Sequence, residues 1–220
     1  MASKQRYKIQ QILFILLGIA IPTSIAVTNM ILGALVLCWI LEGGVSRKLK
    51  HIISSSWMIA IFLLIILYLL GMLWGDNHNN VSWQFQRLLL LLAFPVLITI
   101  NLEQKTIKKS VVGFLSVNFI SAVLAILINN NIIQDLGIYI SFIKSDWQTA
   151  AFIKYNYHNV LLSLAFLLAT YIVVEVKTRY KYLFILFIIV YSISIFTERG
   201  RAGQVLFNLF NLFFILYYNK

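Results

Sequence analysis

Long apolar runs are the feature that most constrains how this chain folds. The hydrocarbon core of a bilayer is about 30 Å thick and takes about 20 apolar residues per crossing helix. Backbone N–H and C=O groups inside lipid must be satisfied within the segment, so such runs fold as helices. Eight apolar segments follow one another along the sequence: 12–25, 28–41, 57–74, 88–100, 111–128, 159–175, 182–196 and 205–218. They predict an all-α integral membrane protein, a bundle of about eight transmembrane helices.

The composition supports the same class. Hydrophobic residues make up 61% of the 220 residues and charged residues only 11%, and the mean hydropathy is +0.88. Soluble domains contain about 45–50% apolar and about 25% charged residues. We therefore expect one transmembrane helical domain over residues 1–220, with no room for a soluble domain. The single cysteine, Cys38, lies within an apolar run and is predicted to be a small core residue.

The first two apolar segments are the difficult pair. Residues 12–41 are too long for one upright helix at 1.5 Å per residue and short for two full crossings. Pro22, Thr23 and Ser24 interrupt the run, and proline breaks the hydrogen-bonding pattern of a helix. The sequence therefore predicts two short or re-entrant helices here.

The distribution of basic residues sets the expected topology. With eight crossings and both termini in the cytoplasm, thirteen of the eighteen Lys and Arg residues face inward and five face outward. This follows the positive-inside rule, which fusing the first two segments would violate. The net charge of +11 then reflects topology and contact with membrane lipids, and it does not indicate nucleic-acid binding.

One long connection, residues 129–158, is expected on the outer side. Apolar residues recur in it at three-to-four spacing, at positions 133, 136, 140, 143, 147 and 151. This spacing predicts an amphipathic helix on the outer leaflet. An ordinary loop that covers the bundle explains the pattern equally well.

Two arginines stand between the last two apolar segments, in FTERGRAGQV (196–205). Under the expected topology Arg199 and Arg201 emerge on the outer side, where basic residues are disfavoured. A lone arginine at a membrane boundary commonly extends to lipid phosphates. Two arginines flanked by Gly200 and Gly203 instead favour close approach to a ligand, and guanidinium groups suit diphosphate geometry. Arg87, at the start of segment 88–100, either joins this site or is an interfacial anchor.

Three tracts resemble one known family. FTERGRAGQVLFNLF (196–210), with its G-R-A-G core, is similar to the arginine signature of the O-antigen ligase and polymerase family of bacterial envelope glycosyltransferases. YNYHNVLLSLAFLLATY (155–171) resembles the family's helix start with a polar His/Asn pair. IPTSIAVTNMILGALVLCWIL (21–41) resembles its broken first hairpin.

The resemblance implies an enzyme of the bacterial inner membrane. Such enzymes transfer a glycan from undecaprenyl diphosphate to a glycolipid acceptor, commonly lipid A core, on the periplasmic face without a metal or other cofactor. Arg201 matches the signature arginine and, with His158, is the expected catalytic residue. Arg199, Arg201, Arg87 and Asn159 are expected to bind the donor diphosphate. The alternative role for His158 is a helix cap or an interfacial group.

The sequence also departs from the family. It resembles the amino-terminal half, without the helices and the large periplasmic loop that are believed to activate the acceptor. A fragment, a split enzyme completed by a second chain and a short relative with another role stay open.

The competing class is a non-enzymatic carrier or a helper subunit of envelope polysaccharide assembly. A carrier needs polar groups deep in several helices, and these are sparse in the sequence. They are expected to connect helices: Asn118, Ser121, Ser163, Thr170, Ser192, Ser194, Asn208 and Asn211. Neither a metal-ligand cluster nor a nucleotide-binding motif is found.

Overall fold

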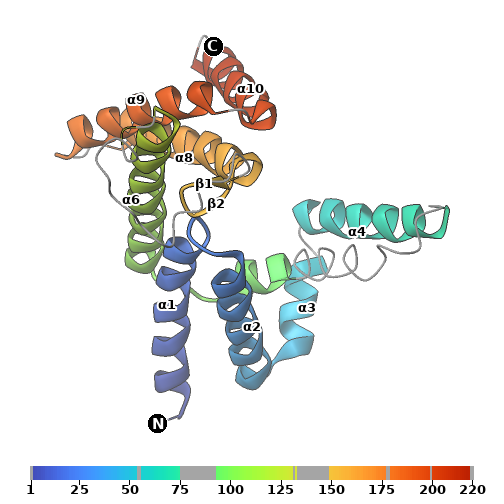
Figure 1. The fold of residues 1–220 in the computed structure, drawn as a ribbon. Helices are drawn as coiled ribbons and strands as arrows, with labels where there is room; N and C mark the ends of the chain where they lie inside the picture. The colour runs from blue at the N-terminus through green and yellow to red at the C-terminus, as the bar shows by residue number, and fades with distance from the viewer. Residues whose placement is uncertain are drawn as a thin grey trace. The chain divides into compact units, whose positions relative to one another are not determined.

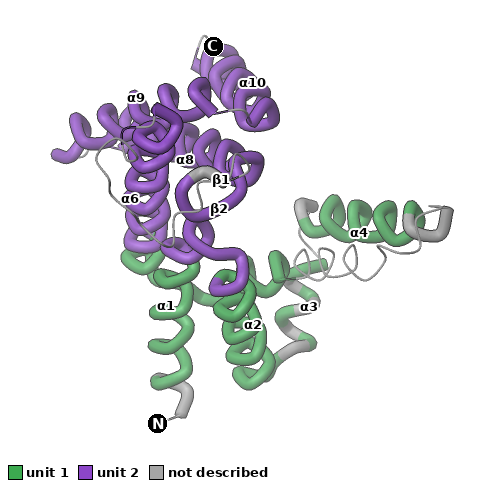
Figure 2. Tube along the Cα trace, viewed as in Figure 1, with its two compact units in different colours: residues 1–17, 28–107 green, residues 18–27, 108–220 purple. Residues whose placement is uncertain are grey.

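The computed structural model describes residues 2–53, 56–74, 93–130, 132, 149–176, 179–198 and 200–218. The chain divides into two compact units (Figure 2). Unit 1 comprises Met1–Leu17 and Thr28–Ile107, and unit 2 comprises Gly18–Val27 and Lys108–Lys220. Each unit has its own network of contacts.

Within the described ranges the protein consists of helices and one short hairpin (Figure 1). The helices are α1 (Ala2–Ala20), α2 (Ile25–Glu42), α3 (Val45–Ile53), α4 (Ser56–Trp74), α6 (Gln104–Asn129), α8 (Tyr155–Glu175), α9 (Lys181–Thr197) and α10 (Arg201–Tyr218). Residues 93–99 are also helical. The hairpin pairs β1 (Thr149–Ala150) antiparallel to β2 (Ile153–Lys154).

Three of these helices, α2, α6 and α8, are long and apolar enough to cross a membrane. Two shorter apolar helical stretches accompany them, Met58–Gly71 within α4 and Lys181–Thr197. Many large apolar side chains on these helices are exposed, including Leu67 of α4 at 64%. Exposed apolar surface on this scale marks contact with lipid or with other proteins. The all-helical class is therefore confirmed, and the three long apolar helices suggest a membrane protein. The eight crossings stay a prediction.

The break in the first apolar run lies where the sequence predicts it. Helix α1 ends at Ala20 and α2 begins at Ile25. At its other end, α2 gives way to α3 through Gly43 and Gly44, whose φ angles are +76° and +67°. This left-handed conformation strongly favours glycine. Helix α3 was not predicted, because charge alone marked its residues as a loop.

Unit 2 has a core built by α6, α8 and α9. Its buried residues are Phe114, Leu115, Ala122, Leu162, Ala165, Phe166, Ala169, Phe184, Phe187, Tyr191 and Ile195. The small alanines of α6 and α8 allow close helix approach, as is typical of packing in membranes. Tyr191 Oη donates a 2.6 Å hydrogen bond to the Leu115 carbonyl, which links α9 to α6.

The long connection 129–158 is only partly described. The predicted amphipathic helix lies mostly in 133–148, outside the described residues. The hairpin occupies 149–154, and α8 already begins at Tyr155. Helix α8 therefore begins four residues before the predicted apolar segment 159–175. Within segment 88–100, residues 88–92 are likewise outside the described residues.

Candidate functional site

The first turns of α8 carry the polar pair that the sequence singled out. The hairpin β1–β2 leads directly into α8, and Ala151 makes its tight turn with a φ of +53°. His158 and Asn159 follow within the first two turns of the helix. Both side chains are 0% exposed, so neither is an interfacial group.

His158 is held from both sides of its ring. Its Nε2 atom lies 2.8 Å from Ser121 Oγ of α6, and its Nδ1 atom lies 2.8 Å from Glu198 Oε1, just after α9. A carboxylate only accepts, so Nδ1 donates to Glu198. Glu198 Oε1 also accepts a 2.8 Å hydrogen bond from Ser194 Oγ. These four residues, Ser121, His158, Ser194 and Glu198, form what we call the His158 network, and it joins α6, α8 and the end of α9.

The His158 network has the connectivity of a serine–histidine–carboxylate triad, but its side chains are buried and bonded to one another. Ser121 and His158 are 0% exposed and Glu198 is 5% exposed. Buried polar groups that satisfy one another in this way specify a unique packing. In this conformation the imidazole reaches no substrate, so the geometry favours a positioning role for His158 rather than proton transfer.

Asn159 brings α8 against the start of α10. Its Nδ2 donates a 3.1 Å hydrogen bond to the Gly200 carbonyl. One turn later, Ser163 Oγ donates to the Gly203 carbonyl at 2.7 Å. A Cβ atom on Gly200 would lie 2.2 Å from Asn159 Nδ2, and one on Gly203 would lie 2.5 Å from the Asn159 carbonyl oxygen.

The glycines of the G-R-A-G tract therefore have a packing role. The sequence suggested that Gly200 and Gly203 allow a ligand to approach, and the approach that the structure displays is that of Asn159. Neither glycine is among the residues with positive φ. Glycine is needed at both positions because the backbone of Gly200 and Gly203 packs directly against Asn159 of α8, which leaves no space for a Cβ atom.

Arg201 is the first residue of α10, and its side chain is exposed. The nearest carboxylate along the chain, Glu198, is engaged by His158 and Ser194. No ion pair of Arg201 occurs within the described ranges. The first N–H groups of a helix lack acceptors inside the helix, and the helix dipole is positive there. Arg201 thus presents its guanidinium at a helix end that attracts anions.

The structure brings some of the expected site residues together. His158 and Asn159 contact the segment 198–203, which contains Arg201. Arg199 and Arg87 lie outside the described residues, so their expected roles stay predictions. Glu198 was missed as a site residue. Its position in the tract 196–205, as the carboxylate next to the two arginines, was the available signal, because a carboxylate there can accept a hydrogen bond from His158.

The mid-helix polar residues connect helices, as expected, only in part. Ser121 and Ser163 connect helices. Four others, Asn118, Thr170, Ser192 and Asn211, donate to carbonyls of their own helix four residues earlier. Among the described residues, His, Cys, Asp and Glu form no group of three that could hold a metal ion.

Comparison with protein-family models, with curated proteins and with solved structures finds no match for this chain. The family resemblance therefore depends on the short tracts given above. Two of them, 155–171 and 196–210, contain the residues that meet at the start of α10.

Proposed function

We propose that this protein is an O-antigen ligase-like component of the bacterial inner membrane. It binds undecaprenyl diphosphate carrying a glycan, for transfer to lipid A core or a similar glycolipid acceptor on the periplasmic face. The observation that carries the proposal is the exposed guanidinium of Arg201 at the start of α10. It is left available because the nearby carboxylate of Glu198 is bonded to His158.

The chemistry of the donor fits such a position. The leaving group of glycan transfer is a lipid diphosphate, whose negative charge grows as the glycosidic bond breaks. Fixed guanidinium donors and the end of a helix stabilise that charge without reorganisation. In this proposal Arg201 contacts the diphosphate, and Arg199 and Arg87 add further donors. His158 and Asn159 hold the segment that carries Arg201 and do not touch the substrate.

The proposed topology has eight crossings and both termini in the cytoplasm. The three long apolar helices α2, α6 and α8 support it, as does the excess of basic residues on the inward segments. The proposed partners are the lipid-linked glycan, the glycolipid acceptor and membrane lipids, and a second chain that supplies the acceptor-activating part is one of the alternatives that stay open. No metal or other cofactor takes part in the proposed reaction.

A carrier is the less favoured reading. A path for a charged substrate needs polar side chains free to face it. Several of the described polar groups inside the helices are instead bonded within the protein. Ser163 bonds across to α10, and the Asn118 amide nitrogen and the Thr170 hydroxyl bond within their own helices, although the Asn118 amide oxygen has no partner among the described residues. A helper subunit that does not bind the donor is the alternative that the following experiment separates.

The test is binding of the lipid carrier by the purified full-length chain in detergent. We expect undecaprenyl diphosphate to bind more tightly than undecaprenyl monophosphate. Arg201→Ala should weaken diphosphate binding by about tenfold or more, since a hydrogen bond to a charged group contributes about 1.5–3 kcal/mol and 1.4 kcal/mol is tenfold. Arg201→Lys should recover only part of the affinity, because an ammonium group lacks the bidentate fork.

Lys154→Ala is the matched control. Lys154 is an exposed cation directly before α8, so its removal changes the net charge equally and should leave the affinity unchanged. Equal binding of diphosphate and monophosphate, or wild-type affinity in Arg201→Ala, would reject donor binding and favour the helper subunit.

A further inference from the structure

The polar end of unit 1 gathers basic residues from three segments of the chain. Arg6 and Lys8 lie on α1, Lys48 and Lys50 on α3, and Lys105 at the start of α6. All except Lys48 are exposed. Among the described residues, two carboxylates accompany these five cations, Glu42 and Glu103. We call this set of seven residues the basic end of unit 1.

Hydrogen bonds hold the basic end together. Arg6 Nη1 donates to the Leu41 carbonyl in the last turn of α2. Tyr7 Oη donates to Glu103 Oε1 at 3.3 Å, and desolvation together with the Glu103 carboxylate raises the pKa of the Tyr7 phenol. Gln11 Nε2 donates to the Asn101 carbonyl at 3.0 Å. Segments distant in sequence are thus fixed side by side within unit 1.

Lys48 neutralises one of the two carboxylates. Its ammonium group lies 2.7 Å from Glu42 Oε2 and 3.0 Å from the Trp39 carbonyl oxygen. It also lies 4.8 Å from the centre of the Trp39 ring. Trp39 in turn donates a 2.8 Å hydrogen bond to Thr99 Oγ1. These contacts hold the junction of α2 and α3 together. Because Glu42 is paired with Lys48, its negative charge does not neutralise the other four cations.

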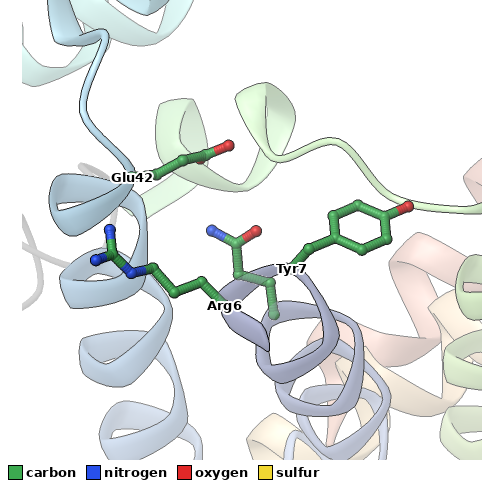
Figure 3. A pocket seen from close by; sticks show the side chains of 4 residues that line it. Arg6, Tyr7 and Glu42 are labelled. Carbon is green, nitrogen blue, oxygen red and sulfur yellow. The ribbon is translucent and has the colours of Figure 1, made fainter. Parts of the chain in front are cut away.

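A small pocket opens at this end, lined by Arg6, Tyr7, Gln10 and Glu42 (Figure 3). Arg6 extends from α1 toward α2, whereas Tyr7 points the opposite way. The cavity volume is about 80 Å³, which exceeds the roughly 10–15 Å³ that one water needs on this measure. A phosphate-sized group fits within it.

Gln10, which lines the pocket, has an amide N–H donor without a hydrogen-bond acceptor in the described part of the chain. Its side chain is 3% exposed, and its Nε2 atom has no hydrogen-bond partner among the described residues. Leaving a buried donor unpaired destabilises a fold by about 1–3 kcal/mol. An acceptor that enters the pocket from outside would remove this penalty, and the guanidinium of Arg6 beside it selects an anionic acceptor.

We infer that the basic end of unit 1 is a binding site for an anionic phospholipid of the inner leaflet. The lipid phosphate occupies the pocket, where Arg6 and Gln10 Nε2 donate to it. Helix α3, with the sequence VSRKLKHII, combines apolar and basic residues at helical spacing and lies along the headgroups. The positive-inside pattern places this end at the inner leaflet, where anionic lipids attract basic segments.

The test titrates the purified full-length chain in neutral detergent with phosphatidylglycerol or phosphatidylcholine. Native mass spectrometry counts the lipid molecules retained. We expect one phosphatidylglycerol to bind at least several-fold more tightly than phosphatidylcholine. Arg6→Gln should weaken that binding by about tenfold, the loss expected for one charged hydrogen bond.

Gln10→Leu separates binding from folding. Removing an unpaired buried donor does not destabilise the empty protein, so the melting temperature should hold while phosphatidylglycerol affinity falls several-fold. Lys154→Gln, with the same charge loss as Arg6→Gln and located in unit 2, should bind phosphatidylglycerol normally.

Three results would overturn the inference. They are equal affinity for the two lipids, unchanged phosphatidylglycerol binding in Arg6→Gln, and displacement of the lipid by soluble glycerol phosphate. The last would identify a site for free phosphate rather than for a lipid. None of these outcomes depends on the proposed donor site in unit 2, because Arg201 is unchanged in every variant.

Discussion

Gly203→Ala is the substitution that the geometry of unit 2 addresses most directly. A Cβ atom at this position would lie 2.5 Å from the Asn159 carbonyl oxygen, and 2.6 Å from both the Asn159 carbonyl carbon and its Cβ. Two of these atoms belong to the backbone, so rotation of a side chain does not relieve the clash. The start of α10 must move away from α8 instead.

The expected loss of stability follows from what that movement breaks. Ser163 Oγ would lose its 2.7 Å hydrogen bond to the Gly203 carbonyl, and Asn159 Nδ2 its 3.1 Å bond to the Gly200 carbonyl. Each contributes about 1 kcal/mol, and overpacking costs about 1–3 kcal/mol. Alanine regains up to about 1 kcal/mol of helix propensity. We therefore expect a net decrease of about 2–4 kcal/mol in the free energy of unfolding.

The assay is unfolding of the full-length chain in mixed micelles with increasing dodecyl sulfate, followed by circular dichroism. Gly33→Ala in α2 is the matched control, since no atom lies within 4 Å of the Cβ it would add; it should leave stability unchanged or raise it. The affinity for undecaprenyl diphosphate should also fall in Gly203→Ala, because Arg201 moves with α10. Wild-type stability in Gly203→Ala would refute the packing role of this glycine.

Two further predictions use the same unfolding assay. Glu198→Ala removes the hydrogen-bond acceptor of His158 inside the core. Breaking a buried pair of this kind lowers the free energy of unfolding by about 3–5 kcal/mol. A change within about 0.5 kcal/mol, the effect of a surface substitution, would show that the His158 network does not stabilise the fold. Tyr191→Phe removes the hydrogen bond to the Leu115 carbonyl and should cost about 1 kcal/mol, whereas Tyr182→Phe, at an 84% exposed position, should have no effect; equal losses in the two would contradict the assignment.

The helices of this protein were largely predictable because lipid imposes a simple rule on sequence. Apolar length and internal hydrogen bonding leave helices as the only solution, and proline at position 22 marks the break between α1 and α2. Helix α3 was not predicted because it is rich in basic residues and lacks a long apolar run, so its residues were assigned to the connection between two apolar segments. The positive φ angles of Gly43 and Gly44 turn the chain so that a new helix begins directly after α2.

The candidate site was predictable only in part. The sequence singled out His158 and Asn159 as a polar pair near a helix start, and both lie in the first two turns of α8, although residue 158 was expected to end the connection 129–158. It did not indicate that Ser121 and Glu198 would meet the ring of His158, because residues 37 and 40 positions away become neighbours only when helices pack.

The role of the glycines in the tract 196–205 could not be decided from the sequence, because the group that approaches them comes from a distant part of the chain. The absence of a side chain indicates that something approaches closely, whether a ligand or another helix. Periodicity does not identify the neighbour. At Gly203 the neighbour is the backbone of Asn159, and that contact becomes visible only in three dimensions.

The side of the membrane that Arg201 faces is the most direct test of the proposed function. Ala202 is exposed beside Arg201, and Ser46 is exposed on α3, so each is replaced by cysteine in a Cys38→Ala background. Intact spheroplasts are then treated with a membrane-impermeant maleimide. We predict labelling at position 202 without permeabilisation and at position 46 only after it. Labelling of position 202 only after permeabilisation would place Arg201 in the cytosol and contradict donor binding at the periplasmic face.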